Sequence, residues 1–287
     1  MKRQNIELIT LDGWKLFSER KNSTNYISED GTKMLKVFTS FTKMDEKGLI
    51  REKRISDLVY KMNISTPKTY KIVKVGDGYG IISEYISAKR SISRIISESY
   101  DNKDKYIKIF ADFTKDIHSK QCNSIQFVSV KKLILDGLKQ AYFFNDVEKK
   151  NIKKLLKDIP NTKNCLVRDY QFSNVIIDGN DNPYLIDLGT VCYGHEDFDL
   201  AFLYYFTHYI EERVVNNILH ITYPQANECW DRFIKYYFPH YSLEEIENKN
   251  KYLSKLSLVM ILSQINTLNV IDLIADVKHK SFEDTYK

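Results

Sequence analysis

The sequence predicts an α+β fold of two lobes, in which a small sheet with one helix precedes a larger, mainly helical part. Before residue 86, short β-like runs alternate with turn residues, and one segment of helical periodicity lies among them. After residue 86, most segments show helical spacing. With 287 residues, of which 43% are hydrophobic, the chain is long enough for two packed lobes. We therefore expect one lobe over residues 1–86 and a second over residues 87–287.

The first lobe is expected to be a small antiparallel sheet that carries one helix. Its strands are predicted from β-like runs bounded by turn residues, at 14–17, 24–28, 33–38, 69–75 and 80–86. Turn sequences at residues 29–31 and 76–78 join neighbouring runs. Residues 45–62 place Leu49, Ile55 and Val59 at helical spacing. This spacing predicts an amphipathic helix between the strands.

The second lobe is expected to be helical apart from one hairpin. Helical patterns occur at residues 92–96, 106–118, 128–144, 146–156 and 199–209. Two β-like runs, at 175–178 and 184–186, flank a turn formed by residues 179–182. A β-hairpin therefore interrupts the helices.

Composition argues against nucleic acid as a partner. The formal net charge of +5 results from 43 basic and 38 acidic residues, which are scattered along the chain rather than gathered in a basic stripe. No window approaches eighteen apolar residues, so we expect no membrane span. The oligomeric state is not predicted by any of these features.

Cysteine usage favours a reducing compartment. The four cysteines lie far apart, without a Cys-x-x-Cys pair or a histidine at metal-ligand spacing. Free thiols are typical of cytoplasmic proteins. The first twelve residues contain no apolar stretch of signal-peptide length. We therefore expect a soluble cytoplasmic protein.

Three polar residues surround the predicted hairpin at a spacing that suits phosphoryl transfer. Asp169 and Asn174 precede its first strand, five residues apart, and Asp187 follows its second strand after thirteen more. A turn between a helix and a strand can present the first two side chains to one cavity, and the returning strand can bring the third to its mouth. Phosphoryl transfer depends on positioning and on neutralisation of phosphate charge by Mg²⁺, which prefers oxygen ligands. The pattern therefore points to a phosphotransferase site.

This pattern resembles the catalytic loop and metal-binding aspartate of the protein-kinase-like superfamily, most closely its aminoglycoside phosphotransferase and choline kinase branch. The resemblance implies a bilobal protein-kinase-like fold. It also implies transfer of the γ-phosphate of ATP to a hydroxyl of a small molecule that is aminoglycoside-, choline- or sugar-like. By the same resemblance, Asp169 orients or deprotonates the acceptor hydroxyl, and Asn174 and Asp187 bind Mg²⁺. ATP and Mg²⁺ are thus the implied cofactors.

Other segments resemble the family in the same order along the chain, over roughly residues 14–205. Lys36, in the run KMLKVF, matches the lysine that binds ATP phosphates, and Glu52 in the next helix matches its acidic partner. Glu84 and Ile86 match the hinge, where backbone groups would bind adenine. Asp199, in GHEDFDLA, matches the aspartate that opens a helix and braces the catalytic loop.

The residues before Asp169 depart from the family pattern. Val167 and Arg168 stand where the small-molecule branch usually carries His-Gly. Arg168 resembles instead the arginine with which protein kinases engage a phosphorylated activation loop, so a protein or lipopolysaccharide-sugar kinase is one alternative. Only nine residues separate Asp187 from Asp197, too few for a long phosphorylatable segment. The short segment favours a small-molecule acceptor.

The expected phosphate-covering loop, residues 18–25, also departs from the pattern because it contains no glycine. Its backbone cannot approach phosphates as freely as a glycine-rich loop, so Arg20, Ser23 and Thr24 are candidate replacements. A pseudokinase that acts as a nucleotide-binding scaffold is therefore a second alternative. The presence of all five principal family residues weighs against it: Lys36, Glu52, Asp169, Asn174 and Asp187.

Two histidines near these motifs are expected to have structural roles. His118 lies at the end of an apolar-periodic helix, where packing or capping fits better than ligand binding. His195 lies in the activation-segment motif, where it could contact an acceptor or cap the following turn. We favour the cap.

Overall fold

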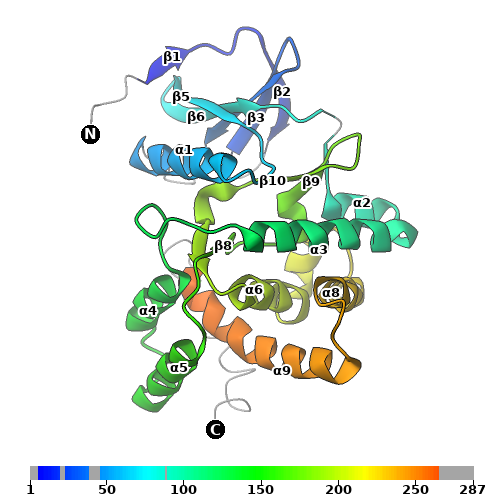
Figure 1. Ribbon diagram of the computed structural model, residues 1–287. Coiled ribbons are helices and arrows are strands. Elements are labelled where there is room, and N and C mark those ends of the chain that lie inside the picture. The colour runs from blue at the N-terminus through cyan, green and yellow to red at the C-terminus, as the bar shows by residue number, and fades with distance from the viewer. Residues whose placement is uncertain (1–5, 20–22, 39–45, 88, 265–287) are drawn as a thin grey trace. The chain divides into compact units, whose positions relative to one another are not determined.

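The computed structural model describes residues 6–264, except for residues 20–22, 39–45 and 88. Contacts divide the chain into two compact units, which we describe separately (Figure 1). The first is formed by the chain up to residue 90 together with residues 175–189, and the second by residues 91–174 and the chain from residue 190 onward. The sequence-based division had placed residues 175–189 in the second lobe. The lobe boundary at residue 86 stays a prediction.

A six-stranded sheet forms most of the first unit, in the order β1-β5-β6-β4-β3-β2. The strands are β1 (Glu7–Ile9), β2 (Trp14–Glu19), β3 (Ser23–Ser28), β4 (Lys33–Phe38), β5 (Thr69–Val75) and β6 (Gly78–Glu84). From β5 to β2 all neighbours pair antiparallel, as predicted. The edge strand β1, which the sequence analysis missed, pairs parallel with β5.

Helix α1 (Glu46–Lys61) lies along one face of this sheet, as Figure 1 shows. Its buried Leu49 packs with Ile72 of β5 and Ile81 of β6. Lys36 of β4 is the direct partner of Ile81 in the antiparallel ladder. Paired residues of neighbouring strands project from the same side of a sheet. The Lys36 side chain therefore projects from the face that α1 covers. The predicted first residue of this helix, Asp45, lies outside the described residues.

A hairpin of β9 (Val175–Ile177) and β10 (Pro183–Leu185) completes the first unit. The carboxylate of Asp178 accepts two backbone N–H groups across its turn, which is how an aspartate stabilises such a loop. The N–H of Leu185 donates to the Ser65 carbonyl at 2.8 Å. The Leu185 carbonyl in turn accepts from Thr66 Oγ1 at 2.8 Å. These bonds fix the chain just before Asp187.

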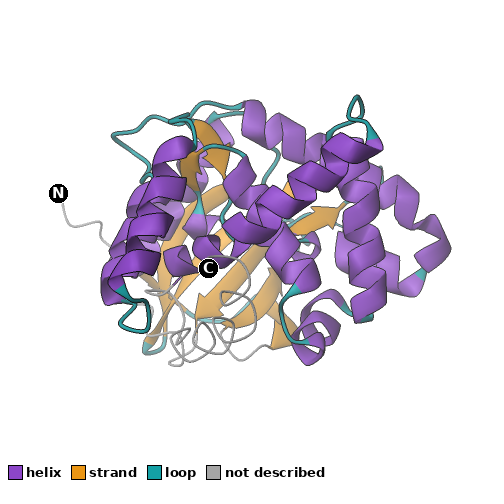
Figure 2. Ribbon diagram, turned by 90° about the horizontal axis from the view of Figure 1, so that it is seen from below, coloured by secondary structure: helices purple, strands orange, loops and turns teal. Residues whose placement is uncertain are grey.

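The second unit is mainly helical, and Figure 2 shows its helices packed side by side. Its helices are α2 (Ile92–Glu98), α3 (Lys103–Ser119), α4 (Val130–Gln140), α5 (Asp146–Asp158), α6 (Asp197–His208), α7 (Glu212–Leu219), α8 (Tyr223–Tyr237) and α9 (Leu243–Met260). The short helix η5 (Ile261–Gln264) follows α9, and η3 (Phe172–Asn174) precedes β9. Two short strands, β8 (Asn164–Leu166) and β11 (Cys192–Gly194), pair antiparallel. Strand β7 (Arg90–Ser91) precedes α2.

Local sequence explains several helix starts. Reciprocal bonds between the N-cap residue and the third helical residue begin three helices, in the pairs Asn145/Glu148, Thr222/Gln225 and Ser242/Glu245. The Asn145/Glu148 pair also explains why α4 ends at Gln140, before the predicted end of this helix at residue 144. Residues 141–145 form the turn that places Asn145 at the start of α5. Each helix in the described part of the chain is too short or too polar for a membrane span.

An aromatic core centres on Phe110 of α3. Its ring stacks on Tyr170 with centroids 4.7 Å apart, and it also contacts Phe172 at 4.7 Å and Phe233 of α8 at 5.5 Å. Tyr170 and Phe172 belong to the segment that follows Asp169. The helical core therefore anchors the predicted catalytic loop.

The sheet is expected to depend on Leu35, which is fully buried against Val73 and Ile82. Leu35→Ala should lower the free energy of unfolding by about 2–5 kcal/mol, because the truncation removes buried methyl groups and leaves a cavity. Urea denaturation measures this change. Leu16→Ala is the matched control, since Leu16 of the same sheet is 59% exposed. Equal stabilities of the two variants would contradict the assigned core.

Candidate functional site

In the first unit, Lys36 and Asp187 form an ion pair, although they are 151 positions apart in the sequence. Lys36 Nζ lies 2.8 Å from Asp187 Oδ1, and the two side chains are 32% and 47% exposed. Asp187 adopts a positive φ of 59°, which aspartate tolerates better than most residues. A lysine and an aspartate are therefore held together at a partly open position, where added ligands can reach both.

Glu52 of α1 belongs to the same group of charges. Burial raises the pKa of Glu52, the Lys36 ammonium opposes that rise, and the Asp187 carboxylate adds to it. A side chain at Gly189 would begin 3.8 Å from Glu52 Cγ, so the chain just after Asp187 passes close to this glutamate. The structure therefore brings Lys36, Glu52 and Asp187 close together in the first unit.

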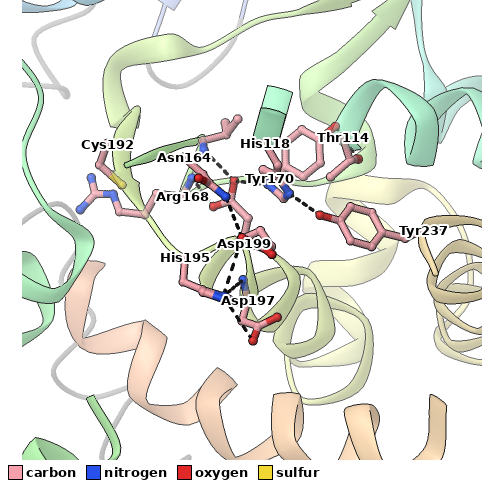
Figure 3. Close-up of polar contacts among 12 residues, drawn as sticks. Thr114, His118, Asn164, Arg168, Tyr170, Cys192, His195, Asp197, Asp199 and Tyr237 are labelled. Carbon is pink, nitrogen blue, oxygen red and sulfur yellow. Dashed lines mark hydrogen bonds and ion pairs between the residues drawn. The ribbon is translucent and has the colours of Figure 1, made fainter. Parts of the chain in front are cut away.

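In the second unit, Asp199 binds the backbone just before Asp169 (Figure 3). Its side chain, at the start of α6, is fully buried. Asp199 Oδ2 accepts the Val167 N–H at 2.7 Å, and Oδ1 accepts the Arg168 N–H at 2.8 Å. A carboxylate that accepts two backbone amides fixes their orientation strongly. The bracing function implied for Asp199 is thus visible in its bonds.

His118 of α3 supports Asp199 from the other side. Its Nε2 lies 3.3 Å from Asp199 Oδ2, and its Nδ1 lies 2.8 Å from the Tyr237 hydroxyl (Figure 3). The carboxylate only accepts, so Nε2–H donates to Asp199, and Nδ1 is hydrogen-bonded to the Tyr237 hydroxyl. Burial raises the pKa of Tyr237, which keeps its hydroxyl protonated. His118 therefore has the structural role that we expected, with partners that the sequence did not reveal.

The family histidine that Val167 replaces is not needed to brace this loop. The Val167 side chain is fully buried, its N–H donates to Asp199, and its carbonyl accepts from Thr190 Oγ1 at 2.8 Å. Both backbone groups are thus satisfied by residues outside the loop. The departure from His-Gly therefore leaves the position of the loop backbone well determined.

Arg168 adopts a left-handed backbone conformation with φ of 70°. For a residue with a Cβ, this conformation costs about 1–2 kcal/mol, a cost that glycine would not incur. Arg168 as a whole is 4% exposed, and its Nη1 donates to the Ser263 carbonyl of η5 at 2.6 Å. Arg168 therefore binds another part of its own unit through its side chain.

The loop from Asp169 to Asn174 has a candidate functional residue at each end and buried residues between them. Tyr170 is buried and lies 2.9 Å from Thr114 Oγ1, hydroxyl to hydroxyl. Asn174 Nδ2 donates to the Asp169 carbonyl at 2.8 Å, which joins the two ends of the loop. Because the amide nitrogen of Asn174 is engaged, its oxygen is the end of the side chain that can bind a cation. Asp169 remains partly exposed.

These features agree with a comparison to known protein families. The phosphotransferase enzyme family matches residues 14–232 of the chain. The chain belongs to the phosphotransferase enzyme family. No curated protein matches the sequence.

Solved structures support the kinase-like fold of this phosphotransferase. An ethanolamine kinase from Plasmodium vivax has a TM-score of 0.61 and 13% identity, over 96% of this chain and 83% of its own. A choline kinase from Streptococcus pneumoniae has a TM-score of 0.53 and 14% identity, over 95% and 92%. An aminoglycoside phosphotransferase from Streptomyces rimosus has a TM-score of 0.51 and 15% identity, over 85% and 93%. At these identities the likeness establishes the fold, and the predicted fold class is confirmed.

Glu84, which we predicted to belong to a hinge, is the last residue of β6. The Glu84 N–H donates to the Lys68 carbonyl at 2.8 Å, so the backbone group that Glu84 can offer to a base is its carbonyl. Ile86 is buried just beyond the strand. Of the candidate phosphate-loop replacements, Ser23 and Thr24 lie in β3, and Arg20 falls outside the described residues.

His195 caps the start of α6, as we favoured. Its Nδ1 accepts the Asp197 N–H at 3.3 Å, which satisfies one backbone donor at the helix start. The sequence analysis missed Tyr237 and Ser263, which connect to the predicted catalytic loop through His118 and Arg168. No local motif marks them, because both act only through tertiary contacts.

Replacement of Asp199 is expected to loosen the loop. Asp199→Asn should lower the free energy of unfolding by about 1–3 kcal/mol, because the amide can accept one backbone N–H but turns a donor toward the other. Urea denaturation tests this expectation. Asp158→Asn, at an exposed position of α5, is the matched control and should change stability little. An Asp199→Asn variant as stable as the control would contradict the bracing role.

The raised pKa of Glu52 predicts a pH-dependent gain in stability when its charge is removed. Its folded-state pKa lies above the ordinary value of 4.5, so the folded protein holds the proton more tightly than the unfolded chain. Wild type therefore loses stability as the pH rises from below 4.5 through the folded-state pKa. Glu52→Gln cannot ionise and should become progressively more stable than wild type over that rise.

Unfolding curves at a series of pH values measure the difference between Glu52→Gln and wild type. Glu244→Gln, at an exposed glutamate of α9, is the matched control for the substitution itself. A Glu52→Gln difference that shrinks as the pH rises would show that favourable partners of the carboxylate outweigh its burial.

Proposed function

We propose that this phosphotransferase uses ATP and Mg²⁺ to move the γ-phosphate to a hydroxyl group of a small molecule. The observation that carries the proposal is the Lys36–Asp187 ion pair at 2.8 Å, with Glu52 beside it. When a metal–nucleotide complex binds, the Lys36 ammonium would pair with phosphate oxygens and the Asp187 carboxylate would bind the metal ion. The ion pair between the two side chains would then open. Their mutual contact neutralises both groups when no nucleotide is present.

Each of the two residues proposed as metal ligands suits Mg²⁺ by its chemistry. Asp187 offers a carboxylate and Asn174 offers an amide oxygen, and Mg²⁺ is commonly held by one or two such protein oxygens together with phosphates and water. The described residues contain no group of three His, Cys, Asp or Glu that would form a metal centre by itself. The metal would therefore arrive with the nucleotide, where it would neutralise charge on the phosphates.

The remaining roles follow from the chain's own residues. Asp169, partly exposed on a braced loop, would orient the acceptor hydroxyl and accept its proton. Lys36 would bind phosphate oxygens, and Glu52 would hold the ammonium in place. The backbone of Glu84 and Ile86 would bind adenine. We propose that the first lobe comprises residues 1–86 and therefore ends at these residues.

A small-molecule acceptor is favoured by the segment between Asp187 and α6. Strand β11 uses part of this short stretch, pairing Cys192 with Leu166 of β8. Arg168, the main argument for a protein kinase, is buried and donates to Ser263, so it is engaged within its own unit. Aminoglycoside-, choline- and sugar-like alcohols are the acceptor classes to test. A cytoplasmic location would fit the four free cysteines, all of which are buried.

We expect the purified protein to transfer label from γ-labelled ATP to a compound in a small-molecule filtrate of host-cell extract, in the presence of Mg²⁺. Asp169→Asn should lower kcat by about 10²–10⁴-fold, because the proton acceptor is lost. Thin-layer chromatography and mass spectrometry identify the labelled product. Label found only on proteins would support the protein-kinase alternative instead.

The metal role is checked in the same preparation. ATP with Mg²⁺ should raise the melting temperature of wild type, and either EDTA or Asp187→Ala should abolish the shift. Asp169→Asn is the matched control, because it should keep the shift while losing transfer. A shift that survives EDTA, with no transfer to any fraction, would point to the nucleotide-binding scaffold.

A further inference from the structure

The left-handed conformation of Arg168 is held by contacts on both its backbone and its side chain. Its N–H donates to Asp199 at 2.8 Å, and its Nη1 donates to the Ser263 carbonyl at 2.6 Å. Both Arg168 and Ser263 are 4% exposed. A residue with a Cβ relaxes readily to negative φ unless its surroundings prevent it. The conformation of Arg168 therefore depends on η5 as well as on Asp199.

The position of η5 is fixed from another side by α4. A Cβ added at Gly137 would lie 1.9 Å from the Leu262 carbonyl oxygen, so the backbones of α4 and η5 approach as closely as glycine allows. Glycine inside a helix lowers helix stability relative to alanine, and close approach is a common reason to find it there. Helix η5 is thus packed against α4 and bound by Arg168.

We infer that Arg168 is a positioning residue that couples helix η5 at the end of α9 to the direction of Asp169. The inference rests on the proposed function, in which Asp169 meets the acceptor. Arg168 immediately precedes Asp169, so a change of its φ would turn the Asp169 side chain. While η5 holds the guanidinium, φ stays positive and Asp169 keeps its direction. When η5 is displaced, Arg168 relaxes and Asp169 moves.

Three substitutions at Arg168 separate the bond to η5 from the backbone requirement. Arg168→Met removes the donor but keeps the Cβ, so kcat should fall by about tenfold or more, with KM for ATP little changed. Arg168→Lys keeps a donor and should retain most of kcat. Arg168→Gly adopts positive φ without help, so it should lose less kcat than Arg168→Met. Arg213→Met, at an exposed arginine of α7, is the matched control and should behave as wild type.

Gly137→Ala perturbs η5 without touching the loop. It should lower kcat in the wild-type background but have little further effect in the Arg168→Gly background, because there the loop no longer depends on η5. An equal loss in both backgrounds would overturn the coupling. So would wild-type kcat in Arg168→Met.

Hydrogen–deuterium exchange tests the coupling without a substrate. It also does not require the Gly137→Ala variant, which could fail to fold. Arg168→Met should speed exchange by about tenfold in two peptides, one covering residues 165–174 and one covering residues 258–264, while Arg168→Lys leaves both protected. Unchanged exchange in the 165–174 peptide of Arg168→Met would overturn the inference. Absence of phosphate transfer by wild type would overturn the proposed function alone, and the exchange results would still decide the coupling.

Discussion

The candidate site in the second unit depends on the hydrogen bonds that the buried Asp199 carboxylate accepts from the backbone before Asp169. An anion with no exposure is costly unless donors surround it. Here the donors are two backbone N–H groups and an imidazole, supplied by Val167, Arg168 and His118. Their geometry determines the path of the chain into Asp169. The charge and the loop therefore stabilise each other, since the loop backbone solvates the carboxylate and the carboxylate fixes the loop.

This arrangement explains how the chain departs from its family without losing the loop. Neither the side chain of Val167 nor a glycine at position 168 is required for bracing, because the bonds to Asp199 use the backbone. The side chains at these positions are then available for other contacts. Val167 fills the core, and Arg168 binds η5. Both side chains thus connect the loop to other parts of the second unit.

In the first unit, two carboxylates, Glu52 and Asp187, lie close to one ammonium group, that of Lys36. Strand alternation turns Lys36 toward the face that α1 covers, and the register of β4 with β6 places it beside Ile81. Glu52 comes from α1 and Asp187 from the chain after β10. Burial disfavours the charge of Glu52, and the Lys36 ammonium offsets part of that cost. The Lys36–Asp187 pair remains partly exposed and so can exchange partners.

The sequence by itself determined the fold class, the order of most elements up to α6 and the spacing of the polar motif, because these depend on periodicity, turn residues and caps that act over a few neighbouring positions. The spacing of polar residues around the predicted hairpin drew attention to Asp187, and the resemblance to a family added Lys36 and Glu52. Only the tertiary structure decided the contacts between distant residues, such as Lys36 with Asp187 and Arg168 with Ser263, 151 and 95 positions apart. Strand β1 and helix η5 were not predicted from the sequence, because they too depend on contacts between distant residues. Their places depend on which surfaces remain to be covered once the chain has packed, and no short stretch of sequence contains that information.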